Sequence, residues 1–121
     1  MTLEETIVAA IQSVPALAAQ PIRPNAADDA DRAPYVIYRQ VGGRREQVLR
    51  GDCGLANPRV QIDVYAETAL QAASLKKAIR VAILDTPALS ATLIDEGSGE
   101  DPASKLQRQR QDFSFWFKDP N

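Results

Sequence analysis

The 121-residue sequence contains no histidine and a single cysteine, Cys53. Without histidine, the chain cannot build a Ser-His-Asp or Cys-His nucleophile or a His-ligated metal site from its own residues. A single cysteine excludes an intrachain disulfide and a cysteine-rich metal cluster. Cys53 stands between Gly51-Asp52 and Gly54, which is typical of a turn. We therefore expect no catalytic residue, no cofactor and no bound metal.

Long apolar runs and an excess of positive charge are also missing. The longest apolar run, residues 7–11, is far shorter than the roughly 20 residues that cross a bilayer. No signal peptide opens the chain, so we expect synthesis in the cytoplasm and no membrane partner. Fourteen Lys and Arg against sixteen Asp and Glu give a net charge of −2, which argues against general nucleic-acid binding. The length suffices for one domain, 1–121.

Two segments have the pattern of amphipathic helices. Thr2 and Glu5 have the spacing of a capping box, and the apolar face that follows ends at Pro15. A second segment begins after Thr68 and closes before Pro87. Its apolar stripe consists of Ala72, Leu75, Ala78, Ile79, Ala82 and Ile83. Both patterns predict helices that cover a sheet.

Several segments have the pattern of strands, because β-branched and aromatic residues are concentrated in them or apolar and polar residues alternate. They are residues 35–41, 59–65, 90–96 and 106–118. Gly42-Gly43 predicts a hairpin turn after the first of them, with residues 44–50 as its return arm. In the last, Phe113, Phe115 and Phe117 share one face, which predicts burial.

Two other segments read as irregular structure. Residues 20–33 are rich in Pro, Ala, Asn and Asp and predict a loop, and residues 97–102 predict a flexible turn. The Asp residues of the loop lack the Gly and Glu of a calcium loop. The order helix, strand, strand, strand, helix, strand, strand then predicts an α+β fold, with an antiparallel or mixed sheet of about four or five strands and two helices mainly on one face.

A family resemblance rests on four segments in a fixed order. They are Pro-Tyr-Val-Ile-Tyr at 34–38, the stretch at 51–55, Arg-Val-Gln-Ile-Asp-Val-Tyr-Ala at 59–66, and Asp-Phe-Ser-Phe-Trp at 112–116 after an Ala-rich helix. Over nearly the whole chain the sequence resembles the small tail-completion or head-to-tail joining proteins of long-tailed bacteriophages, which are similar in fold to tail-terminator proteins.

The resemblance implies a structural protein of a phage or prophage virion and no enzymatic activity. It implies a ring, hexameric in this family, at the junction between the head connector and the tail. The expected partners are other copies of the chain, head-connector proteins and tail-tube proteins. Before assembly the protein would be in the host cytoplasm, and monomeric when dilute.

Two charged clusters are the candidate interaction residues. The basic cluster has four arginines against Glu46, and the acidic cluster has four carboxylates. Their residues are Arg39, Arg44, Arg45 and Arg50, and Asp95, Glu96, Glu100 and Asp101. Opposite charges on one small domain suit a head-to-tail contact, which joins two different surfaces of the same protein. Alternatively, each cluster is only a solvated hairpin tip.

Two other function classes compete with this reading. A nucleic-acid-binding module would use the basic cluster and Arg59 with Tyr35 and Tyr38 on a sheet, but the acidic segments would repel phosphates. A small hydrolase would use Asp63 and Asp112 as carboxylates. Asp63, however, belongs to an alternating strand face that needs only water or an arginine partner.

Overall fold

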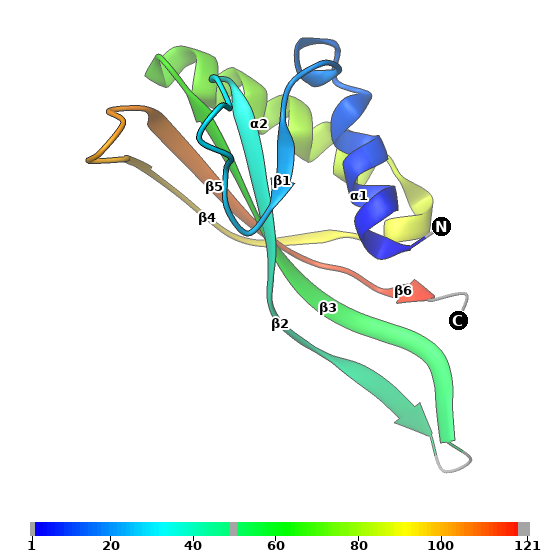
Figure 1. Ribbon diagram of the computed structural model, residues 1–121. Helices are drawn as coiled ribbons and strands as arrows, with labels where there is room; N and C mark the ends of the chain where they lie inside the picture. Colours follow the sequence, from blue (N-terminus) through cyan, green and yellow to red (C-terminus); the bar gives the residue numbers. More distant parts are fainter. Residues whose placement is uncertain (1, 49–50, 119–121) are drawn as a thin grey trace.

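Both α-helices of the computed structural model form where the sequence predicts them (Figure 1). The structure describes residues 2–48 and 51–118, with only the backbone of residues 42–48, 51–56 and 118. Helix α1 (Leu3–Gln12) begins at the capping box, in which the Glu5 N–H donates to the Thr2 hydroxyl over 3.1 Å. Helix α2 (Ala69–Leu84) is capped by the Thr68 hydroxyl. Short 3-10 helices, η1 (Pro15–Leu17) and η2 (Pro87–Leu89), follow them.

The sheet has the strand order β1-β2-β3-β5-β4, and β6 pairs with the far part of β3. β1 is parallel to β2, and every other pairing is antiparallel. The strands are β1 (Ile22–Pro24), β2 (Tyr35–Val48), β3 (Gly51–Ala66), β4 (Thr92–Glu100), β5 (Gln107–Ser114) and β6 (Phe117–Lys118). Both helices lie on the same face of the sheet (Figure 1). The predicted α+β fold is therefore confirmed.

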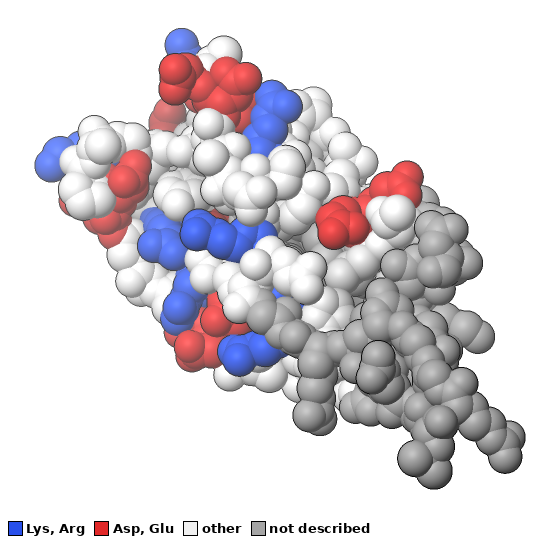
Figure 2. Space-filling model, turned by 60° about the horizontal axis from the view of Figure 1, so that its bottom comes forward, with Lys and Arg blue, Asp and Glu red and all other residues white. Residues whose placement is uncertain are grey.

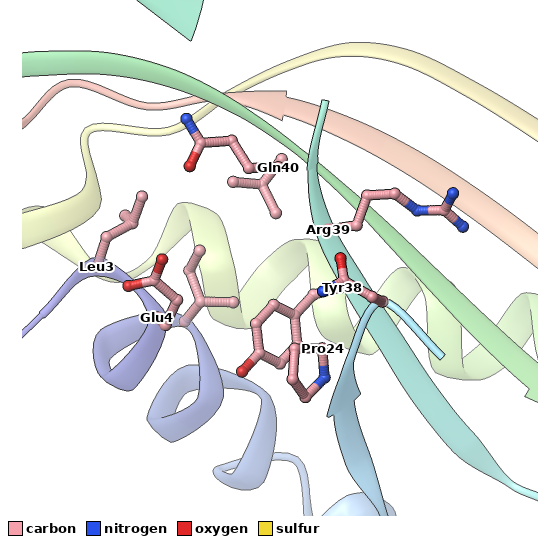
Figure 3. A pocket seen from close by; sticks show the side chains of 9 residues that line it. Leu3, Glu4, Pro24, Tyr38, Arg39 and Gln40 are labelled. Carbon is pink, nitrogen blue, oxygen red and sulfur yellow. The ribbon is translucent and has the colours of Figure 1, made fainter. Parts of the chain in front are cut away.

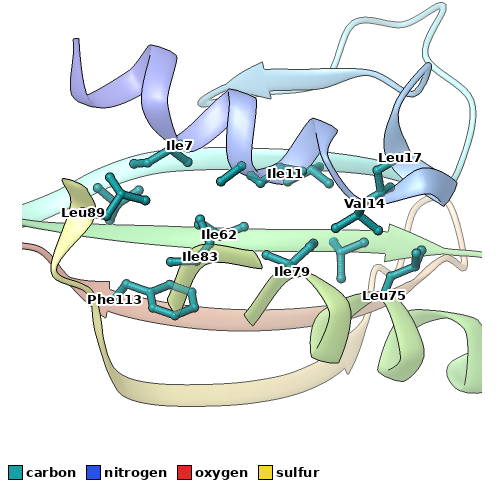
Figure 4. Packing of buried hydrophobic residues seen from close by; sticks show 14 of the residues in the cluster. Ile7, Ile11, Val14, Leu17, Ile62, Leu75, Ile79, Ile83, Leu89 and Phe113 are labelled. Atoms are coloured by element: carbon teal, nitrogen blue, oxygen red, sulfur yellow. The ribbon is translucent and has the colours of Figure 1, made fainter. Parts of the chain in front are cut away.

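The core lies between this face and the helices (Figure 4). Ile7 and Ile11 of α1 and Ile79 and Ile83 of α2 are at most 1% exposed, and they pack onto the alternate apolar residues of β3. Fully burying one such side chain contributes about 1.5–3 kcal/mol. The apolar stripes therefore hold both helices on one face of the sheet.

The predicted hairpin turn at Gly42-Gly43 is wrong. Both glycines lie within β2, opposite Arg59 and Pro58 of β3, and the pairing continues to Val48 opposite Gly51. The glycines mark a register shift after Gln40, where a bulge bends the strand and does not end it. Residues 44–48 therefore extend β2 and do not form a return arm, and Gly51 and Gly54 begin β3 and do not form a turn.

Two further segments predicted as irregular contain strand. The loop at 20–33 includes β1, which pairs with Val36, Ile37 and Tyr38 and is too short to show a pattern in the sequence. β4 continues through Gly97 and Gly99, predicted to be in a turn, as far as Glu100. Gly97 lies opposite Arg110, and a Cβ there would stand 3.0 Å from Nη2 of that arginine, so any side chain at this position would require the end of the Arg110 side chain to shift.

The last predicted strand is interrupted at Phe115 and Trp116, between β5 and β6. The Phe115 N–H donates to the Pro58 carbonyl over 3.0 Å, and the Trp116 N–H donates to the Leu89 carbonyl. Even so, all three phenylalanines are buried, as their alternation predicts, and Trp116 is 39% exposed.

Candidate interaction surface

The sheet face away from the helices, the open face, carries a mixed set of charged and aromatic side chains. Residues alternate between the two faces along a strand, so the neighbours of the core residues point here. The open-face residues are Tyr35, Ile37 and Arg39 of β2, Arg59, Gln61, Asp63 and Tyr65 of β3, Arg108, Arg110 and Asp112 of β5, and Asp95 of β4. Figure 2 shows Lys and Arg side chains next to Asp and Glu side chains on one face of the molecule.

Asp63 is the buried centre of this network. Its carboxylate lies 3.3 Å from the Arg108 guanidinium and accepts two hydrogen bonds, of 3.0 and 3.2 Å, from the Gln61 side-chain amide. The Asp63 side chain is 2% exposed and that of Arg108 is 38% exposed. A carboxylate satisfied by its neighbours in this way stabilises the sheet.

Replacing Asp63 by Asn should destabilise the fold by about 1–3 kcal/mol. The new side-chain amide would direct N–H groups at the Arg108 guanidinium and the Gln61 amide, which are themselves donors. Urea denaturation measures the loss. The matched control is Asp95→Asn: that carboxylate is 61% exposed and pairs with Arg110 at 3.3 Å, so the change should cost less than about 1 kcal/mol. Equal losses in the two variants would contradict a special role for Asp63.

Asp112 and Arg108 each keep a buried polar atom without a partner within the described residues. Oδ1 of Asp112 and Nε of Arg108 make no hydrogen bond there, although Asp112 is only 7% exposed. Asp112 lies directly opposite Asp95, and the nearby cations Arg108 and Arg110 are engaged by other carboxylates. A hollow of about 160 Å³ lies beside these arginines, over Gly97. The open face thus offers both charge signs to a contacting surface.

Two tyrosines stack at one end of this face. The rings of Tyr35 and Tyr65 lie 5.0 Å apart at 21°. Burial raises the pKa of both hydroxyls, and the charge of Asp63 raises the pKa of Tyr65 further. Tyr38, by contrast, packs against the core beneath α1. The structure therefore puts Tyr35 and Tyr38, expected together in a nucleic-acid platform, on opposite faces.

The predicted basic cluster is only partly described. Arg39 is exposed on the open face, opposite Gln61. Arg44 and Arg45 lie on the described backbone of β2, opposite Asn57 and Ala56, but their side chains fall outside the described residues. Arg50 falls wholly outside them.

The predicted acidic cluster is spread along one edge strand. Asp95 pairs with Arg110 on the open face, whereas Glu96 accepts a 2.8 Å hydrogen bond from Lys76 of α2, which lowers the pKa of Glu96. Glu100 accepts a bond from Gln107 at the far end of β4. Asp101 begins the next turn, where the Ser104 hydroxyl donates to it and lowers its pKa. The four carboxylates thus line an edge and do not form a compact patch.

A pocket of about 380 Å³ opens between the start of α1, the end of β1 and β2 (Figure 3). Leu3, Ile7 and Val60 give it apolar walls, while Glu4 and Tyr38 supply polar groups. Burial, and then the negative charge of Glu4, raise the pKa of Tyr38. The mixed apolar and polar lining suits contact with another surface.

Metal and membrane sites receive no support from the described part of the chain. Among residues 2–48 and 51–118, no three His, Cys, Asp or Glu side chains come together as metal ligands. None of the helices described is long and apolar enough to span a bilayer.

The open-face network is assembled from several strands, so no single segment of the sequence predicts it. Arg108 and Arg110 alternate with glutamines in β5, and this polar half-strand gave no signal by itself. The signal would have been the charge complementarity between Arg108 and Arg110 and the carboxylates of the neighbouring strands.

The sequence and the fold were compared with those of known proteins. Residues 5–118 match the profile of the family described as tail completion protein gp17. No curated protein sequence matches the chain. Among solved structures, a chain from a virion of a native gene transfer agent (GTA) particle shares the fold, with a TM-score of 0.68 and 12% identity over 95% of this chain and 93% of that one. The family match confirms the resemblance seen in the sequence: this chain belongs to the tail completion protein gp17 family, structural proteins of phage tails.

Proposed function

We propose that the protein completes the tail of a phage or prophage particle as a ring, hexameric by family resemblance, between the head connector and the tail tube. Family membership supports a structural role in the tail. The shared fold with a chain from a gene transfer agent virion supports a place in the particle. The charged and aromatic open face supports contact with other proteins.

One observation carries the ring proposal: the hairpin of β2 and β3 extends far beyond the helices (Figure 1). We call residues 42–48 and 51–57 the arm. Within residues 2–48 and 51–118, β1 covers β2 only at Val36–Tyr38, and β6 pairs with β3 only at Leu55 and Ala56. An isolated two-stranded ribbon is marginally stable in water, so the arm gains stability from a surface outside its own domain.

The proposal is tested in the phage or prophage that encodes the chain. Deleting the gene should leave filled heads and separate tails in electron micrographs, and the intact gene supplied in trans should restore joined particles. A gold-labelled antibody against the chain should mark the head-tail junction. Joined, infectious particles produced without the gene would overturn the proposal.

A further inference from the structure

The sheet has open edges on its two opposite sides. β4 forms one side, and β2 forms the other beyond the three residues that β1 covers. An open edge presents unpaired backbone N–H and C=O groups, which a strand from another chain can bind. Natural proteins usually block such edges, so two long open ones call for an explanation.

The β4 edge is nine residues long, and after a register shift between Leu93 and Asp95 it pairs regularly with β5 as far as Glu100. Within the described chain β4 pairs with β5 alone, and it contains no proline. Most of its residues are exposed, Ser98 among them. Its carboxylates, Asp95, Glu96 and Glu100, make this edge acidic.

The opposite edge is the outer side of β2 from Gln40 to Val48. Register shifts after Gln40 and after Arg45 bend this strand, and bulges of this kind turn a strand away from its own sheet. The sequence places Arg44 and Arg45 on this stretch, against a single acidic residue, Glu46. The arm edge is therefore basic.

Charge selects one of the three pairings that two such edges allow. Pairing β4 with the β4 of another copy would bring carboxylates together, and pairing arm with arm would bring arginines together. Like charges facing each other across a strand pair are destabilising, whereas opposite charges are favourable. The arm edge of one copy and the β4 edge of another are the complementary combination.

Strand direction agrees with this combination. β2 and β4 are antiparallel to each other, because β3 is antiparallel to both β2 and β5, and β4 is antiparallel to β5. When two copies keep the same orientation and one is shifted along the strand direction, so that its arm reaches β4 of the next copy, the arm strand of β2 therefore meets β4 in antiparallel orientation. This contact joins two different surfaces, as a ring of identical subunits requires.

We propose that the arm of one copy adds as an antiparallel strand to the outer edge of β4 in the next copy, so that the sheet continues from subunit to subunit. The inference rests on the proposed ring function and names the two surfaces that make the ring contact. Backbone hydrogen bonds hold the added strand, and the charged side chains set its partner.

Cysteine cross-linking in assembled particles tests the contact. Gln47→Cys and Ser98→Cys are combined in a Cys53→Ser chain, and the particles are treated with a flexible bismaleimide. Because the arm and this part of β4 lie at opposite ends of the sheet, cross-links should join different copies and give a ladder of covalent multimers (Figure 1). Each cysteine alone should give no product above a dimer.

The matched control moves the second cysteine to Ser74, an exposed serine on α2. The chain with Gln47→Cys and Ser74→Cys should give no ladder. The proposal is overturned if this control gives a ladder and the chain with Gln47→Cys and Ser98→Cys gives none. It is also overturned if Ser98→Cys alone gives efficient dimers, which would indicate that β4 pairs with β4.

A charge exchange separates this inference from the proposed function. Glu96→Lys with Glu100→Lys should abolish head-tail joining, and adding Arg44→Glu and Arg45→Glu in the same chain should restore it. If the arm reversal abolishes joining but the β4 reversal does not, the arm binds another surface and the inference fails while the function stands. If gene deletion itself leaves joining intact, the function fails. Thermal melts of all variants establish that they fold.

Discussion

Reversing both arginines of the arm, Arg44→Glu with Arg45→Glu, should abolish the joining of heads to tails while leaving the thermal melt of the free protein nearly unchanged. The arm lies beyond the helices and contributes little to the core, so its charges matter in assembly (Figure 1). Exposed charges are screened over roughly 8 Å at physiological salt, so they act at the contact itself and not at long range. Complementation in a phage that lacks the gene, scored as joined particles, measures the effect.

A control variant carries the same change in net charge on another surface. Lys77→Glu with Arg80→Glu alters the outer side of α2, and particles made with it should join normally. If the arm variant completes particles as well as the parent, the basic arm is not an assembly surface. The contact would then have to be sought at the 20–33 loop or at the acidic turn after β4.

Replacing Phe115 by Ala should cost about 3 kcal/mol or more of folding free energy. The side chain is fully buried, and its ring stacks on that of Phe113 with centroids 5.9 Å apart. Truncation removes this contact and leaves a cavity that the surrounding structure fills only in part. Chemical denaturation of the purified protein measures the change.

Trp116 provides the matched control for that measurement. It is the next residue along the chain and is also a large aromatic, but it is 39% exposed. Trp116→Ala should therefore cost clearly less than Phe115→Ala. A loss below about 1 kcal/mol for Phe115→Ala would show that this side chain does not hold the sheet to the helices.

Elements defined by local chemistry were predictable from the sequence. Both helices begin at the predicted threonine caps, because a cap hydroxyl and the N–H groups it satisfies lie within a few residues of each other. The alternation of Val60, Ile62 and Val64 likewise showed which face of β3 is buried. Such signals need no knowledge of the partner strand.

Features that depend on a neighbouring strand were not predictable. Gly42-Gly43 and Gly97 have the composition of turns, yet a pairing partner keeps each in a strand. β1 exists only because β2 offers it an edge. The candidate site shows the same limit, since the charged clusters were visible in the sequence but the Asp63 and Arg108 pair was not.

The pairing of β3 with both β2 and β5 sets an order for the folding reaction. The pairing of β2 with β3 joins residues as close in sequence as Val48 and Gly51. The pairing of β3 with β5 joins residues as distant in sequence as Val60 and Phe113. Closing the longer loop costs more chain entropy, so we expect the hairpin to form early and β5 to dock late. Contacts made by late segments stabilise the native state more than the transition state. Contacts of Phe115, which follows β5, would thus mainly set the unfolding rate. Contacts within the hairpin of β2 and β3 would mainly set the folding rate.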